Sequence, residues 1–161
     1  GHLVLSTLHT IDASKTVDRI IGVFPKNEEK AIRSRIAQSF RDIVSQRLIP
    51  KADAKGRVAA IEILKSTART REYIERGESE GKSLIDAMEQ GDQEGMQTFD
   101  SVLERYIRTG VVKREDAMPY ATNANNLHLR LADMADTPAP EPAQPEPPKP
   151  DSGSILDMIE R

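Results

Sequence analysis

The chain has 161 residues, of which 37% are hydrophobic and 30% charged, enough for one hydrophobic core with appendages. It contains no Cys, which excludes disulfides, Cys-based zinc sites and a thiol nucleophile. The net charge of −3 gives no electrostatic basis for binding nucleic acid, and no apolar stretch approaches the roughly 18 residues that span a bilayer. We therefore expect a soluble, cytoplasmic protein without a nucleic-acid partner.

The first predicted element is a strand over Leu3–Leu8, a short, continuous apolar run. Such a run is typical of a strand buried on both faces of a parallel sheet. A strand of this kind needs neighbours on both sides, and the rest of the chain offers few candidates. The sequence therefore predicts that the chain is a fragment whose partner strands are encoded upstream.

Two helices are predicted next. Asp12 can cap the first, which ends at Gly22 and Pro25 and buries Val17, Ile20 and Ile21. The second is predicted over Asn27–Leu48, from apolar residues at helical spacing: Ile32, Ile36, Phe40, Ile43, Val44 and Leu48. Its arginines are interpreted as a solvated or subunit-facing surface, since no aromatic residues interleave to stack bases; they are Arg33, Arg35, Arg41 and Arg47.

The stretch LIPKADAKGRVAAIEIL predicts two strands around a turn at Lys55 and Gly56, with Pro50 near a strand start. Glu62 falls inside the second strand, and we expect its carboxylate to face solvent or an interface, because burial would require partners. Four short helices are predicted to follow, over about Thr70–Arg76, Ser83–Gln90, Thr98–Thr109 and Lys113–Tyr120. NLHLRLADM fits either a strand or a short helix, and we favour the helix.

The stretch GESEGKS, at residues 77–83, ends like a nucleotide-binding P-loop but has three residues between its glycines where a P-loop has four. Two glutamates would also repel a polyphosphate. We interpret this stretch as a turn in which Ser83 caps the next helix.

The last part of the chain changes character. TPAPEPAQPEPPKP holds seven prolines and predicts an extended linker. Beyond it, Ile155–Ile159 is apolar, and residues 154–161 are either a frayed terminus or a tethered peptide that docks on a partner.

Two histidines frame the predicted first strand. His2 and His9 lie too far apart along a strand to share a metal ion, so no metal site is predicted. A structural role is the simpler interpretation of each. His9 nevertheless lies at the carboxyl end of the strand, the edge that faces the ligand crevice in open α/β sheets. Thr7 and Thr10 could form hydrogen bonds there, which favours a phosphate-sensing role.

Seven stretches, in order, resemble one family: GHLVLSTLHT, DRIIGVFP, IVSQRLIPK, GRVAAIEIL, EGMQTFD, REDAMPYA and NNLHLRL. They are similar to the type IV pilus retraction ATPases, the twitching-motility PilT/PilU family of secretion ATPases, over about Gly1–Leu131. The resemblance implies an α/β fold: the C-terminal part of a RecA-like P-loop ATPase core, with few strands, then a helical region and a disordered tail. The implied boundaries are residues 1–66, 67–136 and 137–161.

The resemblance also implies a function. The intact protein would be a hexameric motor that hydrolyses ATP with Mg²⁺ and pulls pilins from the pilus base, bound to a platform protein of the inner membrane. His2 and His9 match the family's histidine box, and the Walker A and Walker B segments would lie upstream. The fragment alone would be inactive and would hold no nucleotide tightly. Alternatives are a non-catalytic interaction module and a pilus-assembly or type II secretion ATPase, although the latter commonly carries a Cys-rich zinc motif.

The sequence departs from the family pattern in places. RTREYIER keeps only Arg71 and Ile74 of a family stretch implicated in retraction. The stretches SQRL and GMQTFD look closer to PilU-type than to PilT-type motors. An accessory role therefore competes with the principal one.

Overall fold

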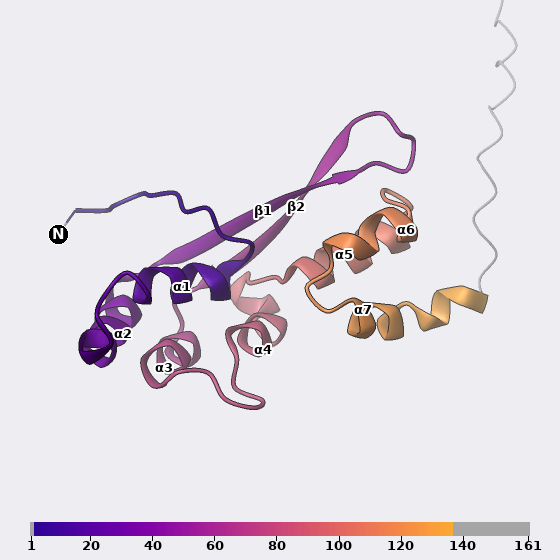
Figure 1. Cartoon of the computed structure of the whole chain (residues 1–161). Coiled ribbons are helices and arrows are strands. Elements are labelled where there is room, and N and C mark those ends of the chain that lie inside the picture. Colours follow the sequence, from indigo (N-terminus) through magenta and orange to yellow (C-terminus); the bar gives the residue numbers. More distant parts are fainter. Residues whose placement is uncertain (1, 137–161) are drawn as a thin grey trace, which may run out of the picture.

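A computed structural model describes residues 2–136 of the chain. A long two-stranded hairpin runs across the molecule, with one group of helices at its base and a second group toward its tip (Figure 1). No helix of this part of the chain combines the length and apolarity needed to cross a bilayer. The elements are α1 (Ala13–Ile21), η1 (Lys26–Glu28), α2 (Glu29–Ser39), β1 (Asp42–Pro50), β2 (Arg57–Lys65), α3 (Ala68–Arg76), α4 (Leu84–Glu89), η2 (Asp92–Glu94), α5 (Phe99–Arg108), α6 (Arg114–Ala117), η3 (Met118–Tyr120), α7 (Ala124–Arg130) and η4 (Ala132–Asp136).

The predicted strand over Leu3–Leu8 is wrong for this structure. Residues 2–11 form no regular secondary structure and pair with no strand among the described residues. The side chains of Leu3, Val4 and Leu5 are 77%, 79% and 89% exposed. An apolar run makes a buried strand only when neighbouring strands flank it, and within residues 2–136 none does.

The predicted helix over Asn27–Leu48 is correct only in its first half. Helix α2 stops at Ser39, and Phe40 already has an extended ψ of 149°. From Asp42 the chain is strand β1, in which exposed and partly buried residues alternate. Ile43, Val44 and Leu48 satisfy a helical period by spacing alone, but β-branched residues favour a pleated strand. Arg41 therefore precedes β1 and Arg47 lies within it, so neither belongs to the predicted basic helix.

The hairpin follows the predicted order, with a shifted first strand. β1 and β2 pair antiparallel from Asp42 with Lys65 to Pro50 with Arg57. Pro50 ends β1 and does not begin it, and the turn uses the left-handed backbone of Ala54 (φ 57°) and Gly56 (φ 88°). One face carries Ala60, Glu62 and Leu64, which are all buried. The opposite face leaves Val44 and Leu48 of β1 63% and 44% exposed.

Two hydrophobic clusters meet on the covered face of the hairpin. The base core joins α1–α4 to Leu64 of β2 and ends at Met96. The tip core joins α5, α6 and α7 to Ile49 of β1 and Ala60 of β2. Because β1 and β2 contribute to both clusters, the hairpin fixes the two helix groups relative to each other.

The helices capped by Asp12, Ser83 and Thr98 begin where the sequence predicts, whereas α3 begins at Ala68, two residues before the predicted Thr70. Five helices have a side-chain N-cap that accepts a backbone N–H of the first turn: Asp12 for α1, Thr67 for α3, Ser83 for α4, Thr98 for α5 and Asn123 for α7. Helix α6 follows Lys113 and has no such cap. The ambiguous stretch NLHLRLADM is helical, with Leu127 and Leu131 fully buried in the tip core.

Candidate functional site

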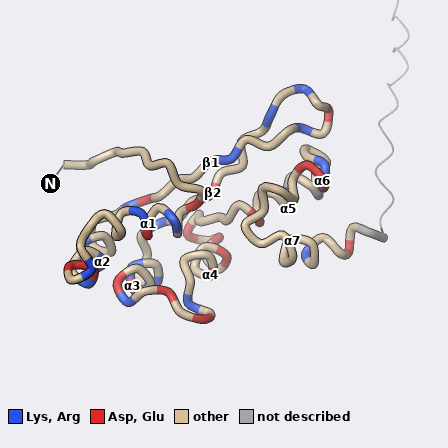
Figure 2. Tube along the Cα trace, viewed as in Figure 1, with Lys and Arg blue, Asp and Glu red and all other residues tan. Residues whose placement is uncertain are grey.

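The predicted site residues of the N-terminal segment are at the surface. His2, Thr7 and His9 are exposed, and Thr10 is half-buried. Figure 2 shows the segment as an uncharged stretch that leads into the charged first turns of α1. Among residues 2–136, no group of three or more His, Asp or Glu side chains lies close enough to hold a metal ion. The positions of these exposed side chains therefore depend on the contacts that residues 10–12 make.

Thr10 is anchored to helix α1. Its hydroxyl lies 2.6 Å from the hydroxyl of Thr16. The Thr16 hydroxyl in turn donates to the carbonyl of Asp12 at 2.9 Å. Since that bond uses the only hydrogen of the Thr16 hydroxyl, Thr10 is the donor in the pair. Thr10 thus keeps no hydroxyl proton for another acceptor while this contact holds.

Glu62 lies under the start of α1, and the prediction that it faces solvent or an interface is wrong. Its side chain is 1% exposed, and its Oε1 accepts the backbone N–H of Ala13 at 2.7 Å. That amide is one of the first-turn donors that a helix cannot satisfy internally. The alternation of side chains along the strand predicts this burial, because Ala60, Glu62 and Leu64 are two residues apart and therefore share the buried face.

Burial is the main influence on the ionisation of Glu62. It raises the pKa of the carboxyl above its usual range, and the nearby charge of Asp12 raises it further. The bond from Ala13 and the positive charge of Arg47 act in the opposite direction. A carboxyl group that is costly to ionise therefore lies directly beneath the junction between the N-terminal segment and α1.

Arg47 reaches the same junction from β1. Register pairs Ser45 with Glu62, so alternation places Arg47 on the same face of the hairpin as that glutamate. Its Nη2 donates to the carbonyl of Ile11 at 2.9 Å. Its Nη1 donates to the carbonyl of Tyr120 in η3, and its Cζ lies 3.9 Å from the centre of the Phe99 ring. Sequence reasoning missed this role because it placed Arg47 on a helix surface.

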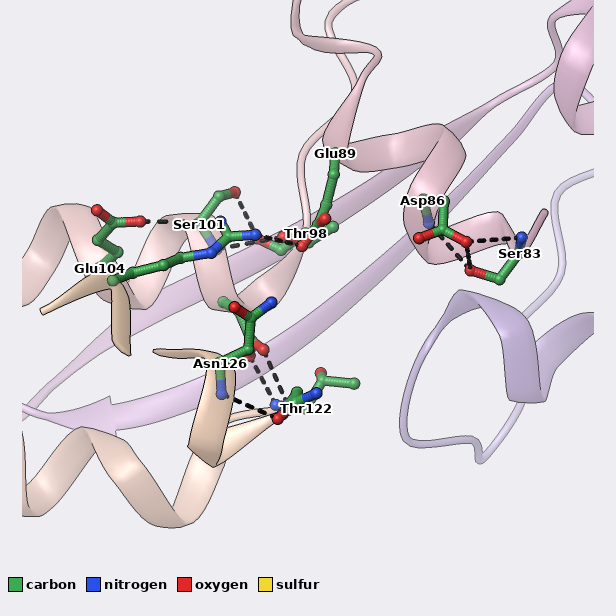
Figure 3. A network of polar contacts seen from close by, with 11 residues as sticks. Ser83, Asp86, Glu89, Thr98, Ser101, Glu104, Thr122 and Asn126 are labelled. Atoms are coloured by element: carbon green, nitrogen blue, oxygen red, sulfur yellow. Dashed lines mark hydrogen bonds and ion pairs between the residues drawn. The ribbon is translucent and has the colours of Figure 1, made fainter. Parts of the chain in front are cut away.

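Asp100, beside the Phe99 that Arg47 contacts, connects the start of α5 to the start of α7. Its carboxylate is buried and accepts the backbone N–H groups of Thr122, at 2.6 Å, and Asn123, at 2.8 Å. Asn123 in turn caps α7 by accepting the N–H of Asn126 (Figure 3). The aspartate of the EGMQTFD stretch thus holds the beginning of α7 against the beginning of α5.

An arginine of α7 extends the same network. Arg130 pairs with Glu89 of α4 at 2.6 Å and with Glu104 of α5 at 3.8 Å, and Figure 3 shows those two glutamates on their separate helices. The pairs are partly solvated, so each contributes little free energy. Their consequence is geometric, because they connect the last helix of the base group to the tip group.

The structure separates the two residues predicted from the RTREYIER stretch. Ile74 of α3 is 1% exposed and belongs to the base core. Arg71, on the same helix, is exposed. Within this structure only Arg71 of the two is accessible to another molecule.

The GESEGKS stretch forms a turn, as predicted. Ser83 caps α4 by accepting the N–H of Asp86, while the Asp86 carboxylate accepts the Ser83 N–H at 2.9 Å and its hydroxyl at 2.6 Å (Figure 3). These bonds lower the pKa of Asp86. The next amide, of Leu84, is taken by Glu78 at 2.8 Å. A phosphate would therefore find these donors already occupied.

Comparison with known proteins places these features in a family. Residues 1–130 match the family model described as "Type II/IV secretion system protein". The chain is 40% identical over 127 residues to the type IV pilus retractation ATPase PilT of Pseudomonas aeruginosa, covering 79% of the chain and 36% of PilT. It is 37% identical over 131 residues to the type IV pilus ATPase PilU of the same organism, covering 81% of the chain and 34% of PilU.

A solved structure agrees with these relatives. A crystal structure of the pilus retraction motor PilT with bound ADP matches 80% of the chain and 35% of that protein, with a TM-score of 0.65 at 32% identity. This match confirms the predicted fold class, a mostly helical part of such an ATPase with few strands. The chain spans about a third of the length of the curated relatives it matches.

Proposed function

Because the chain belongs to the type II/IV secretion system protein family, we propose that it is the C-terminal part of a motor that hydrolyses ATP and drives type IV pilus retraction. The observation that carries this proposal is the 40% identity to a pilus retractation ATPase, sustained over 127 residues. In this account residues 1–66 end the nucleotide-binding core and residues 67–136 form the helical region that follows. The account predicts a Walker A motif, G-x-x-x-x-G-K-[ST], in the gene upstream of Gly1.

The N-terminal segment would report the state of the nucleotide in the intact motor. An imidazole can both donate and accept a hydrogen bond, so His2 and His9 suit the sensing of a phosphate that leaves or arrives. Thr7 and Thr10 would support that role, with Thr10 linking the segment to α1 through Thr16. The intact protein would bind ATP and Mg²⁺ through its upstream segments.

The chain by itself would lack turnover. The 161 residues contain no Walker A sequence, and phosphoryl transfer depends on a phosphate cradle and a bound Mg²⁺. Phosphate release by the purified chain would overturn this part of the proposal. In the full-length protein, His9→Ala should reduce ATP turnover and leave the melting temperature unchanged, whereas unchanged turnover would remove the sensing role.

Assembly and location form the next part of the proposal. The motor would be a hexamer at the cytoplasmic side of the inner membrane, and its force would reach a platform protein at the pilus base. Light scattering of the full-length protein, with and without ATP, tests the hexamer. Loss of twitching on deletion of the gene, restored by the wild-type copy, tests the retraction role.

The identities to PilT and PilU differ by only three percentage points, so a principal and an accessory role are both tested. Deletion in a strain that retains its other retraction motor separates the two roles: a principal motor is needed for twitching, and an accessory motor only for full force. The alternative of a docking module rests on residues 154–161, which lie outside the described residues.

A further inference from the structure

Arg47 connects three segments that are far apart in the sequence. Its guanidinium donates to the carbonyl of Ile11, 36 residues before it, and to the carbonyl of Tyr120, 73 residues after it. Its plane also lies over the ring of Phe99 at 3.9 Å. The N-terminal segment, the start of α5 and η3 therefore meet at one side chain.

Few other polar contacts hold the N-terminal segment. Among the residues that the structure describes, residues 2–11 make two hydrogen bonds. One joins Thr10 to Thr16, which lies in the adjacent helix α1. The other joins Ile11 to Arg47. The Thr10 bond is local, so among the described residues Arg47 makes the one hydrogen-bonded link between the segment and the tip group of helices.

The chemistry of this contact is specific to arginine. A planar guanidinium can donate along two directions at once while its face lies on an aromatic ring. A lysine ammonium keeps the charge but cannot reach two separated carbonyls and stack in the same position. Burial raises the pKa of Glu62 on the same face of the hairpin, and the positive charge of Arg47 partly offsets this effect.

The two side chains of the stacked pair come from stretches singled out in the sequence. Arg47 is the arginine of SQRL, and Phe99 is the phenylalanine of EGMQTFD. Their contact therefore joins these two stretches in the structure.

We propose that Arg47 is a positioning residue for ATP turnover: it fixes the segment that carries His9 relative to α5 and η3, so that the nucleotide state and the placement of the tip helices are linked. This inference rests on the proposed function. Arg47 acts through the carbonyl of Ile11, two residues from His9, and does not touch the nucleotide. Its loss would misplace His9, and displacements of about 1 Å can slow a reaction by up to roughly 100-fold.

The test uses the full-length protein with Arg47→Lys and Arg47→Gln. We expect kcat for ATP to fall about tenfold in both variants, with KM for ATP changed by less than about twofold, because positioning affects the reacting state more than binding. Arg57→Lys is the matched control, since Arg57 lies in the same hairpin, is exposed and makes no side-chain hydrogen bond among the described residues. It should leave both constants unchanged.

A double-mutant cycle separates positioning from a general loss of stability. If Arg47 acts through His9, then His9→Ala combined with Arg47→Lys should be no slower than His9→Ala alone. Independent, multiplicative losses would overturn the proposal, as would a normal kcat in both Arg47 variants. A fall in kcat that tracks a fall in melting temperature would also count against it.

Amide exchange gives a readout that does not depend on turnover. In the Arg47 variants the hydrogen-bonded amides of Ala13, at the start of α1, and Ala121, after η3, should exchange faster, while those of α3 in the base core keep their protection. If the wild-type protein shows no ATP turnover, the proposed function fails and this proposal falls with it. If turnover is normal in the wild type and exchange of the Ala13 and Ala121 amides is unchanged in the variants, only the inference about Arg47 fails.

Discussion

Replacing Glu62 tests whether the buried carboxylate holds the start of α1. Glu62→Gln keeps an oxygen that can accept the Ala13 N–H, now 2.7 Å from Oε1, and removes the charge. Glu62→Leu has a similar volume but no acceptor, so the buried Ala13 amide loses its partner. An unsatisfied buried donor costs about 1 to 3 kcal/mol. We therefore expect the Leu variant to be less stable than the Gln variant by about that amount.

The same pair of proteins tests the ionisation of Glu62. Burial raises the pKa of Glu62 above its usual value of 4.5, so the folded chain retains a proton at pH values where the unfolded chain has lost it. The contribution of Glu62 to stability therefore falls as the pH rises from about 4.5 through the raised pKa. The Gln variant lacks this titration, so its stability relative to the wild type should increase over that range and then level off.

Urea unfolding of the purified chain, followed by far-UV circular dichroism from about pH 4 to about pH 8, measures both effects. Glu80→Gln is the control, because Glu80 is exposed on a loop and should show neither effect. Equal stability of the Leu and Gln variants would refute the role of the Ala13 bond. A difference between Gln variant and wild type that does not change with pH would refute the raised pKa.

Three further substitutions test separate parts of the fold. Asp100→Ala should destabilise the chain by about 2 to 3 kcal/mol in urea unfolding, because the two amides before α7, of Thr122 and Asn123, lose a charged acceptor; wild-type stability would contradict this. Ile74→Ala should cost about 2 to 5 kcal/mol by opening a cavity in the base core, and an unchanged melting temperature would indicate that α3 is not packed there. Ser83→Ala should cost about 1 kcal/mol by removing the cap of α4, and hydrogen exchange should then increase in α4 but not in α5.

The helix starts could be predicted because their signals are local. Asp12, Ser83 and Thr98 each cap a helix through an amide within three residues, so nothing distant in the sequence decides the outcome. The hairpin was predictable for the same reason, since its turn residues separate two apolar runs. Family motifs added the fold class, which no local pattern contained.

The errors arose where distant residues decide the structure. Ile43 and Val44 fit a helical period, but pairing with β2 makes them part of a strand. Leu3–Leu8 has the composition of a buried strand, and the flanking strands that would bury it are not among residues 2–136. Local sequence carries no information about either partner.

The junction residues were missed for a related reason. Arg47 and Glu62 are ordinary charged residues in sequence, and their roles depend on Ile11, Tyr120 and Ala13. Once β1 and β2 are correctly paired, the alternation of side chains along each strand places Arg47 and Glu62 on the covered face. A correct register would therefore have identified the junction before any side chain was seen.

The sharing of one hairpin between two cores has a consequence for synthesis on the ribosome. The base core is complete once Met96 is available, so it can close while the rest of the chain is still being made. The tip core joins Ile49 to Leu131 and must wait for about 35 further residues. Until then, the apolar residues toward the hairpin tip remain uncovered, which makes this interval the time at which a nascent chain most needs a chaperone.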